Sequence, residues 1–315
     1  QLPPKTTAFR EWAIGLVSYA KSESLHQELP YWLNLAQSSA SLPIDQPQGQ
    51  DRNTEASVAQ VITELLPETT HALEKFSQTY HVQLYEVLLI ALAQTLNSWR
   101  RSYHGSSESS ILIDLEGHGR EFLAESVDVS RTIGWFTTIF PVRFSLESTF
   151  HPIEALKSIK EQLRQVPNRG IGYGVLKYLH SDRTVRSRLQ AISPAVKFNY
   201  LRELRIPTHP LVLGLATETS GSPRSPLGKR RYLLEINSFI AEGQLTLHWN
   251  YSRQVHQLAT IQQIAQSFQV ALESLIQQGR SPIDNVHTPS DFAAARLNQD
   301  QLDQVLSKIQ RSGRR

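Results

Sequence analysis

The segment SILIDLEGHGRE, residues 110–121, passes abruptly from an apolar run into charged residues and glycines. The apolar part is short and rich in Ile and Leu, which is typical of a buried β-strand. Two glycines flank His118, so the backbone beyond the strand can turn tightly and approach a ligand closely. Glu116 would leave the strand into a partly dry space, where a carboxylate can act as a proton acceptor. Spacing alone favours a simpler interpretation, a turn with a solvated glutamate and a surface pair of Arg120 with Glu121.

Long helices are predicted on both sides of this strand in the sequence. Residues 84–103 are apolar on almost every face of their first half, which predicts a central, buried helix. Two alternating runs, 232–241 and 244–251, are joined by Glu242-Gly243, a hairpin signal that demands antiparallel pairing. The chain is therefore predicted to be an α/β protein, a two-layer sandwich of mixed sheet and helices, rather than an all-parallel doubly wound fold. Further helices are predicted at 69–80, 152–166 and 258–278, and further strands at 57–66, 133–144 and 195–201.

Changes in composition divide the chain into three parts. Residues 7–37 show the apolar spacing of two helices, and residues 38–53 are rich in Ser, Pro, Gln, Gly and Asp. We therefore expect a helical part at 1–48 and the α/β part at 54–287. The remainder, 288–315, is polar with loosely spaced apolar residues, and is expected to be an inter-domain linker, part helix and part mobile chain.

Composition excludes several classes of function. Hydrophobic residues make up 40% and charged residues 19% of the chain, as in ordinary globular proteins, and no apolar run is long enough to cross a bilayer. The amphipathic start lacks the features of a secretion signal, which favours the cytoplasm. The absence of cysteine removes disulfides and a cysteine nucleophile, and none of the 11 histidines lies in an HExxH arrangement, so no metal is expected. Because methionine is absent as well, we expect a piece of a longer protein.

Nucleic-acid binding is not expected either. The net charge is only +3. The basic run Lys229-Arg230-Arg231 has no aromatic residues interleaved with it, and is predicted to be a solvated loop.

A glycine-rich segment, PNRGIGYG at 167–174, superficially resembles a nucleotide loop. A dinucleotide loop follows a strand and opens a helix, whereas this run follows a helix and a proline. We therefore predict a loop shaped by glycines, with Tyr173 at its tip and no bound phosphate.

Two further segments combine aromatic and small or polar residues. KFNYL at 197–201 puts Asn199 beside Tyr200 at a strand end, where an amide and a phenol can face a ligand oxygen. Taken alone, an ordinary aromatic strand is the simpler interpretation. RTIGWFT at 131–137 is predicted to be mostly core, with Trp135 filling a layer between sheet and helix.

Taken together and in this order, these segments resemble the epimerization domains of nonribosomal peptide synthetases, a branch of the condensation-domain superfamily. The resemblance implies a chloramphenicol-acetyltransferase-like architecture, in which two lobes meet at a V-shaped cleft. Residues 1–48 would then be the end of the N-terminal lobe, 54–287 the C-terminal lobe and 288–315 a linker tail. The matching motifs are DLEGHGRE (114–121), SRTIGWFTTIFPV (130–142), PNRGIGYGVLKYL (167–179) and FNYL (198–201), with PKTTAF (4–9), Trp12, PYW (30–32) and TPSDF (288–292) in support.

The resemblance also implies an activity. Such domains invert an aminoacyl or peptidyl thioester from L to D at Cα, while the substrate is held on the phosphopantetheine of a partner peptidyl carrier protein. They work beside adjacent synthetase domains, bind no cofactor directly, and need neither nucleic acid nor membrane. Glu116 matches the catalytic glutamate, and Asn199 with Tyr200 match a pair suggested to shape the site or stabilise the enolate. The residues expected to bind substrate or to organise loops are His118, Arg120, Trp135 and Tyr173.

Two departures from the family pattern bear on this activity. The family's first motif, HHxxxDG, has no counterpart, because the chain contains no His-His pair. Its second histidine is the partner acid or base, so residues 1–315 are expected to be inactive alone. Arg202 stands where the family usually has glycine. The alternatives are a condensation domain that joins two carrier-bound substrates, which the Glu-Gly-His-Gly form at Glu116 disfavours, and a noncatalytic carrier-docking module.

Overall fold

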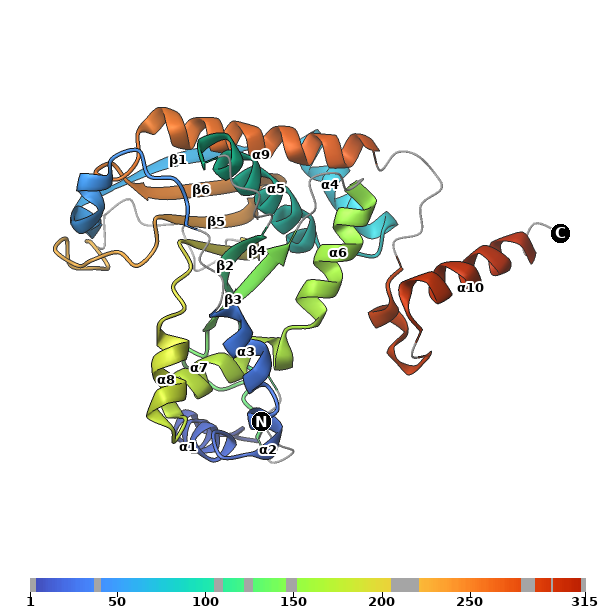
Figure 1. Cartoon of the computed structure of the whole chain (residues 1–315), viewed down its shortest axis with the longest axis horizontal. Helices are drawn as coiled ribbons and strands as arrows, with labels where there is room; N and C mark the ends of the chain where they lie inside the picture. Colours follow the sequence, from blue (N-terminus) through green and yellow to red (C-terminus); the bar gives the residue numbers. More distant parts are fainter. Residues whose placement is uncertain are drawn as a thin grey trace.

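The computed structural model of the protein describes residues 4–36, 41–104, 110–121, 127–145, 152–204, 221–278, 287–295 and 297–312. At its centre is a six-stranded mixed sheet with the strand order β1-β6-β5-β4-β2-β3 (Figure 1). β4 lies parallel to both β2 and β5, whereas the other neighbours pair antiparallel. The predicted α/β class with a mixed sheet is confirmed. The strands are β1 (Val58–Glu64), β2 (Ser110–Gly117), β3 (Thr138–Ser145), β4 (Val196–Glu203), β5 (Leu234–Ala241) and β6 (Gln244–Ser252).

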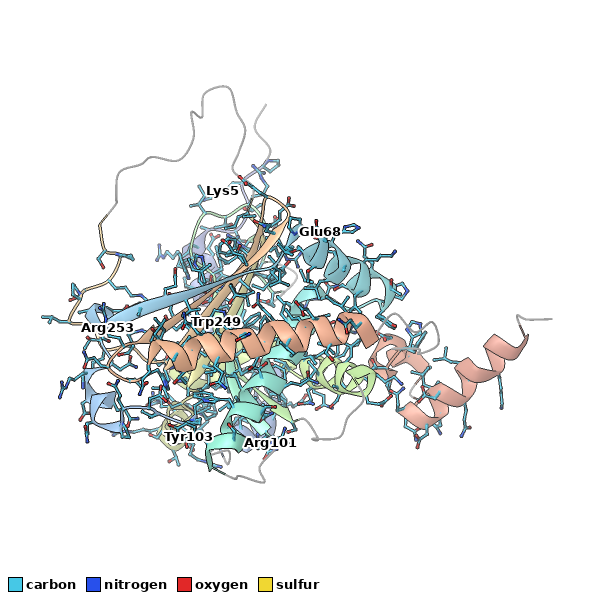
Figure 2. The ribbon with its side chains drawn as sticks, turned by 90° about the horizontal axis from the view of Figure 1, so that it is seen from above. Lys5, Glu68, Arg101, Tyr103, Trp249 and Arg253 are labelled. Carbon is cyan, nitrogen blue, oxygen red and sulfur yellow. The ribbon has the colours of Figure 1, made fainter. Side chains whose placement is uncertain are left out.

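One layer of helices covers the apolar face of the sheet. It consists of α4 (Pro67–Thr79), α5 (Leu84–His104), α6 (Pro152–Arg164) and α9 (Leu258–Gln278). Residues 87–92 of α5 are fully buried, which confirms the predicted central helix. Figure 2 looks onto this layer and shows Trp249 of β6 beneath α9, where its ring lies 5.4 Å from that of Phe268. None of the helices within the described ranges is long and apolar enough to span a bilayer.

A second group of helices lies beyond the β2–β3 edge of the sheet, at the bottom of Figure 1. The sequence predicts two helices within 7–37, but the structure has three. Ser22 begins the second one, because its Oγ accepts a hydrogen bond from the backbone N–H of Leu25 at 3.3 Å. Pro30 stands in the first turn of the third, a position that proline favours. The group comprises α1 (Phe9–Tyr19), α2 (Glu23–His26), α3 (Leu29–Leu35), α7 (Ile171–Leu179) and α8 (Arg183–Gln190).

The predicted loop at 167–174 is wrong beyond its first half. Residues 168–170 all have positive φ, so the chain turns sharply there, within a short 3-10 helix (Pro167–Gly170). α7 begins directly afterwards, because the apolar residues of IGYGVLKYL recur with helical spacing. Tyr173 therefore lies within a helix and is only 2% exposed, rather than standing at a loop tip. Its ring packs 5.2 Å from that of Trp32.

The prediction that Trp135 fills a core layer is also wrong. β3 begins only at Thr138, and Trp135 in the preceding segment is 83% exposed. Its neighbour Phe136 takes the buried position, with its ring 4.7 Å from that of Trp12 and the guanidinium of Arg120 4.0 Å above it. Successive residues of an extended segment point to opposite sides, so burial of Phe136 turns Trp135 outward.

The C-terminal part contacts the α/β part through a buried lysine. It contains a 3-10 helix (Pro289–Ala295) and α10 (Gln299–Ser312), which extends to one side in Figure 1. Lys160 of α6 is 1% exposed, and its Nζ lies 2.5 Å from Asp291 Oδ2. Burial raises the pKa of Asp291, but hydrogen bonds from Lys160 and from the backbone of Thr288 more than offset it and lower the pKa below its ordinary value.

β4 ends in an irregular segment at which Arg202 has a φ of 61°. This left-handed conformation costs a residue with a side chain about 1–2 kcal/mol, whereas glycine adopts it freely. Replacing Arg202 with Gly is therefore expected to raise the free energy of unfolding by about 0.5–1 kcal/mol, after the greater flexibility of glycine in the unfolded chain is subtracted. Urea unfolding monitored by circular dichroism measures this change.

The matched control for this prediction is Leu201→Gly, at the neighbouring exposed position without positive φ. It should lower the free energy of unfolding by about 1 kcal/mol. Equal losses in both variants would show that the conformation of Arg202 stores no strain.

Candidate active site

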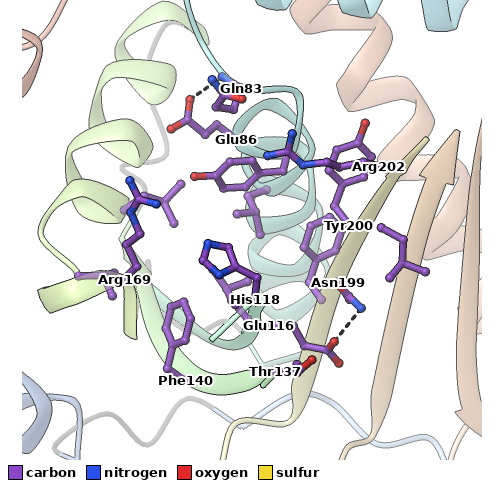
Figure 3. Close-up of a pocket in the computed structure, with 18 of the residues that line it drawn as sticks. Gln83, Glu86, Glu116, His118, Thr137, Phe140, Arg169, Asn199, Tyr200 and Arg202 are labelled. Carbon is purple, nitrogen blue, oxygen red and sulfur yellow. Dashed lines mark hydrogen bonds between the residues drawn. The ribbon is translucent and has the colours of Figure 1, made fainter. Parts of the chain in front are cut away.

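The carboxyl ends of the parallel strands β2 and β4 open into a pocket of about 950 Å³ (Figure 3). Four of the predicted site residues line it: Glu116, His118, Asn199 and Tyr200. The start of α5, the end of α6 and part of β3 complete the wall. The residues of this wall that were not predicted from the sequence include Gln83, Tyr85, Glu86, Arg164, Arg169 and Arg202.

Glu116 is the last side chain of β2 and is held at both carboxylate oxygens. Asn199 Nδ2 donates a hydrogen bond to Glu116 Oε2 at 2.8 Å, which is drawn as a dashed line in Figure 3. Lys197 Nζ lies 3.1 Å from Glu116 Oε1. The glutamate side chain is 19% exposed, so it is neither the solvated residue of the simpler interpretation nor a buried unpaired acid. The carboxylate is ionically paired and fixed at the edge of the pocket.

The register of β2 with β4 explains why these side chains meet. Leu115 lies opposite Phe198, and both are buried on the helix-covered face of the sheet. Since side chains alternate along a strand, Glu116 and Asn199 share the opposite face, together with Lys197. Parallel pairing therefore brings together residues that are more than eighty positions apart in the sequence.

Tyr200 belongs to the pocket wall but points away from Asn199. Adjacent residues of a strand face opposite sides, so the expected Asn–Tyr pair is split between Glu116 and the pocket interior, as the labelled side chains in Figure 3 show. Burial, and secondarily the charge of Glu74, raises the pKa of Tyr200 to about 12. The phenol therefore stays protonated at neutral pH and can donate a hydrogen bond to a ligand oxygen.

The glycine-flanked turn after β2 places His118 in the pocket and Arg120 beside it. The backbone N–H of Arg120 donates to His118 Nδ1 at 2.9 Å, and His118 Nε2 lies 3.5 Å from Glu121 Oε1. The Arg120 side chain turns the other way. It donates to the backbone carbonyl oxygens of Val129 and, at 2.9 Å, of Thr132. Arg120 thus contacts the loop before β3 rather than lining the pocket.

Trp135 and Tyr173, the two other predicted site residues, also lie outside the pocket lining. Tyr173 Oη donates to the carbonyl oxygen of Leu189 at 3.1 Å and accepts from Lys177 Nζ at 3.3 Å. Burial, with the nearby charge of Asp114, raises its pKa. These contacts connect α7 with the end of α8.

The basic run Lys229-Arg230-Arg231 is not the solvated loop that its composition predicts. The Arg230 side chain is fully buried, and its Nη2 donates to the backbone carbonyl oxygen of Asn250 at 3.2 Å. Arg231 Nη2 lies 3.2 Å from Asp114 Oδ2, which also accepts from Tyr232 Oη at 2.7 Å. Burial raises the pKa of Asp114 against both of these partners. The run turns inward because the open face of the sheet carries buried carboxylates.

The first turn of α5 adds a second carboxylate to the pocket wall. The backbone N–H of Gln83 donates to Glu86 Oε2 at 2.8 Å. Burial raises the pKa of Glu86, although this hydrogen bond and the charge of Arg164 lower it. Within the described ranges, no group of three or more His, Asp or Glu side chains is arranged to hold a metal ion.

Comparison with known proteins places this pocket in a defined group. The condensation-domain family model matches residues 1–298. A linear gramicidin synthase of Brevibacillus parabrevis is 42% identical over 98% of this chain and 4% of that protein. Gramicidin S synthase 1 of Brevibacillus brevis is 31% identical over 98% of this chain and 28% of that protein, so the chain spans only a small part of either synthase. The crystal structure of the epimerization domain from the third module of tyrocidine synthetase B matches with a TM-score of 0.75 at 31% identity, over 89% of this chain and 61% of that one.

Proposed function

Since the chain belongs to the condensation-domain family, we propose that it forms part of an epimerization domain of a nonribosomal peptide synthetase, which inverts a carrier-bound aminoacyl or peptidyl thioester from L to D at Cα. The observation that carries this proposal is the Glu116 carboxylate, paired with Asn199 and Lys197 at the mouth of a pocket. A fixed, ionised carboxylate is suited to removing a proton from a bound substrate.

In the proposed reaction, the thioester carbonyl acidifies the Cα–H bond, and Glu116 takes the proton. The electron pair of the broken bond moves into the carbonyl group and forms an enolate. Tyr200 lines the same pocket and is protonated at neutral pH, so its phenol can stabilise the enolate oxygen by a hydrogen bond. Return of a proton to the opposite face by a second acid yields the D centre. Residues 1–315 contain no His-His pair, so we assign that second acid to a part of the domain outside them.

The other predicted residues receive positioning roles in this proposal. His118 lines the pocket and is suited to contacting the substrate. Arg120 holds the loop before β3 through two backbone carbonyl groups, and Tyr173 holds α7 against α8. Exposed Trp135 is available for contact with another part of the domain or with a partner.

The proposed partners follow from the proposed substrate. The thioester is carried on the phosphopantetheine of a peptidyl carrier protein, so the domain itself needs no bound cofactor, and the reaction takes place in the cytoplasm beside adjacent synthetase domains. We also propose that residues 1–48 end the N-terminal lobe, that 54–287 form the C-terminal lobe and that 288–315 lead to the next domain. In support, α1 and α3 pack mainly with α7, α8 and β3 rather than with the helix layer over the sheet.

The test uses the intact domain that contains this chain, together with the neighbouring carrier protein loaded with an L-aminoacyl thioester. In heavy water, we expect deuterium to enter at Cα and the D-isomer to accumulate, as detected by mass spectrometry and chiral chromatography of the released amino acid. Dipeptide formation between two loaded carriers without exchange would support a condensation domain instead. Carrier binding without either reaction would support a docking module.

A further inference from the structure

The structure assigns a positioning role to Lys197, a residue that the proposed function does not by itself require. We infer that its ammonium group holds the Glu116 carboxylate ionised and correctly turned, and that Glu235 and Arg230 support it from behind. This inference rests on the proposed function, because positioning has meaning only if Glu116 moves a proton.

Lys197 is nearly buried, so its charge must be paired. Its side chain is 11% exposed and lies between the hydrophobic residues that bury its strand. An ammonium group in such a place is costly unless carboxylates surround it. Its Nζ lies 3.1 Å from Glu116 Oε1 and 4.0 Å from Glu235 Oε1. The short distance to Glu116 makes this carboxylate the principal partner.

The charges continue in alternation beyond Lys197. Glu235 Oε2 lies 3.4 Å from Nη2 of Arg230, whose side chain is fully buried. The row Glu116, Lys197, Glu235 and Arg230 therefore contains two carboxylates and two cations, and it is neutral only when Glu116 is ionised. Adding a proton to Glu116 leaves an uncompensated positive charge in a poorly hydrated place.

The geometry also restricts how the carboxylate can turn. Asn199 Nδ2 occupies Oε2 at 2.8 Å while Lys197 occupies Oε1, so rotation about the last bond of the side chain breaks both contacts. Asn199 is polar but uncharged, and cannot by itself favour the ionised form as strongly as an ammonium group does. Lys197 thus supplies the charge, and Asn199 completes the orientation.

Lys197→Met in the intact domain tests this role, since Met has a similar length but no charge. At pH 7 we expect kcat for Cα deuterium exchange to fall about 10- to 100-fold with KM changed less than about twofold, because misplacement affects the reacting group and not substrate binding. The acid limb of the pH–kcat profile should move to higher pH by about one unit, because loss of a neighbouring cation makes ionisation of a carboxylate harder. The activity should therefore recover in part at pH 9.

Two further variants separate positioning from general damage. Lys197→Arg keeps the positive charge and should retain kcat within about tenfold and the original acid limb. Lys157→Met is the matched control, because Lys157 is 13% exposed and pairs with Glu154 at 3.3 Å but does not line the pocket. It should leave kcat, KM and the pH profile unchanged. If circular dichroism shows that Lys197→Met is unfolded, Lys197→Gln takes its place with the same expectations.

The outcomes distinguish this inference from the proposed function. Exchange by the parent domain, with an unchanged kcat and pH profile in the charge-removing variants, would overturn the role of Lys197 alone. A lower kcat with an unmoved acid limb would also overturn it, since that pattern reports lost packing. No exchange by the parent domain would overturn the proposed function, and the inference with it.

Discussion

Replacing Glu116 with Gln is expected to lower the rate of Cα proton exchange on the carrier-bound thioester by about 10²–10⁴-fold, the contribution of one positioned acid or base. Gln has the same shape and can still accept the hydrogen bond from Asn199, which Glu116 accepts at 2.8 Å. It has no basic oxygen to take the proton, so the variant should fold normally and bind the carrier yet fail to exchange. Deuterium uptake from heavy water, followed by mass spectrometry of the released amino acid, measures the loss.

A glutamate elsewhere in the chain provides a closely matched control. Glu55 is also 19% exposed, and its Oε1 accepts a hydrogen bond from Arg224 Nη1 at 2.9 Å. Glu55→Gln removes a paired carboxylate of equal exposure that does not line the pocket, and should leave exchange within about twofold, because a pair of this kind contributes only about 0–1 kcal/mol. Rapid exchange that persists in Glu116→Gln would refute the role of Glu116.

The second large effect is expected at the turn that follows Glu116. Gly119 has a φ of 69°, and a Cβ at this position would lie 1.6 Å from the carbonyl oxygen of Phe136. Gly119→Ala must therefore both strain the backbone and push apart the turn after β2 and the segment before β3. We expect the free energy of unfolding to fall by about 3 kcal/mol, from left-handed strain of about 1–2 kcal/mol together with the cost of the overlap. Urea unfolding at pH 7 measures this loss.

The same substitution at a second glycine tests whether the cause is local. Gly174 lies inside α7, has no positive φ, and a Cβ built on it would meet nothing within 4 Å. Gly174→Ala should stabilise the protein by about 0.5–1 kcal/mol, because alanine favours the helix and glycine does not. A loss at Gly119 no larger than about 1 kcal/mol would mean that the turn adapts, and that this glycine is not required by its surroundings.

Local periodicity was sufficient for most of the secondary structure. The predicted helix at 258–278 matches α9 at both ends, and the predicted turn between β5 and β6 has two left-handed residues, Glu242 and Gly243, at φ values of 50° and 77°. Such features depend on neighbours in the sequence, which is why they can be read from it. The failures, at Trp135 and Tyr173, concern burial that is determined by distant segments packing against these residues.

Motifs predicted the chemical groups of the site better than their arrangement. Glu116, His118, Asn199 and Tyr200 do line one pocket. Lys197 was not identified as a site residue, although the polar residues at 197 and 199 alternate with apolar residues in a strand, which is the signal that could have revealed it.

The sequence by itself determined the order of strands and helices along the chain, the carboxylate at the end of β2 and the glycines that turn the chain after it. Only the tertiary structure decided which cation pairs with that carboxylate, and that Asn199 and Tyr200 serve different sides of the sheet. The physical reason is strand register. The pairing of Leu115 with Phe198 joins two distant segments, and a shift of one residue would move every polar side chain of β4 to the other face.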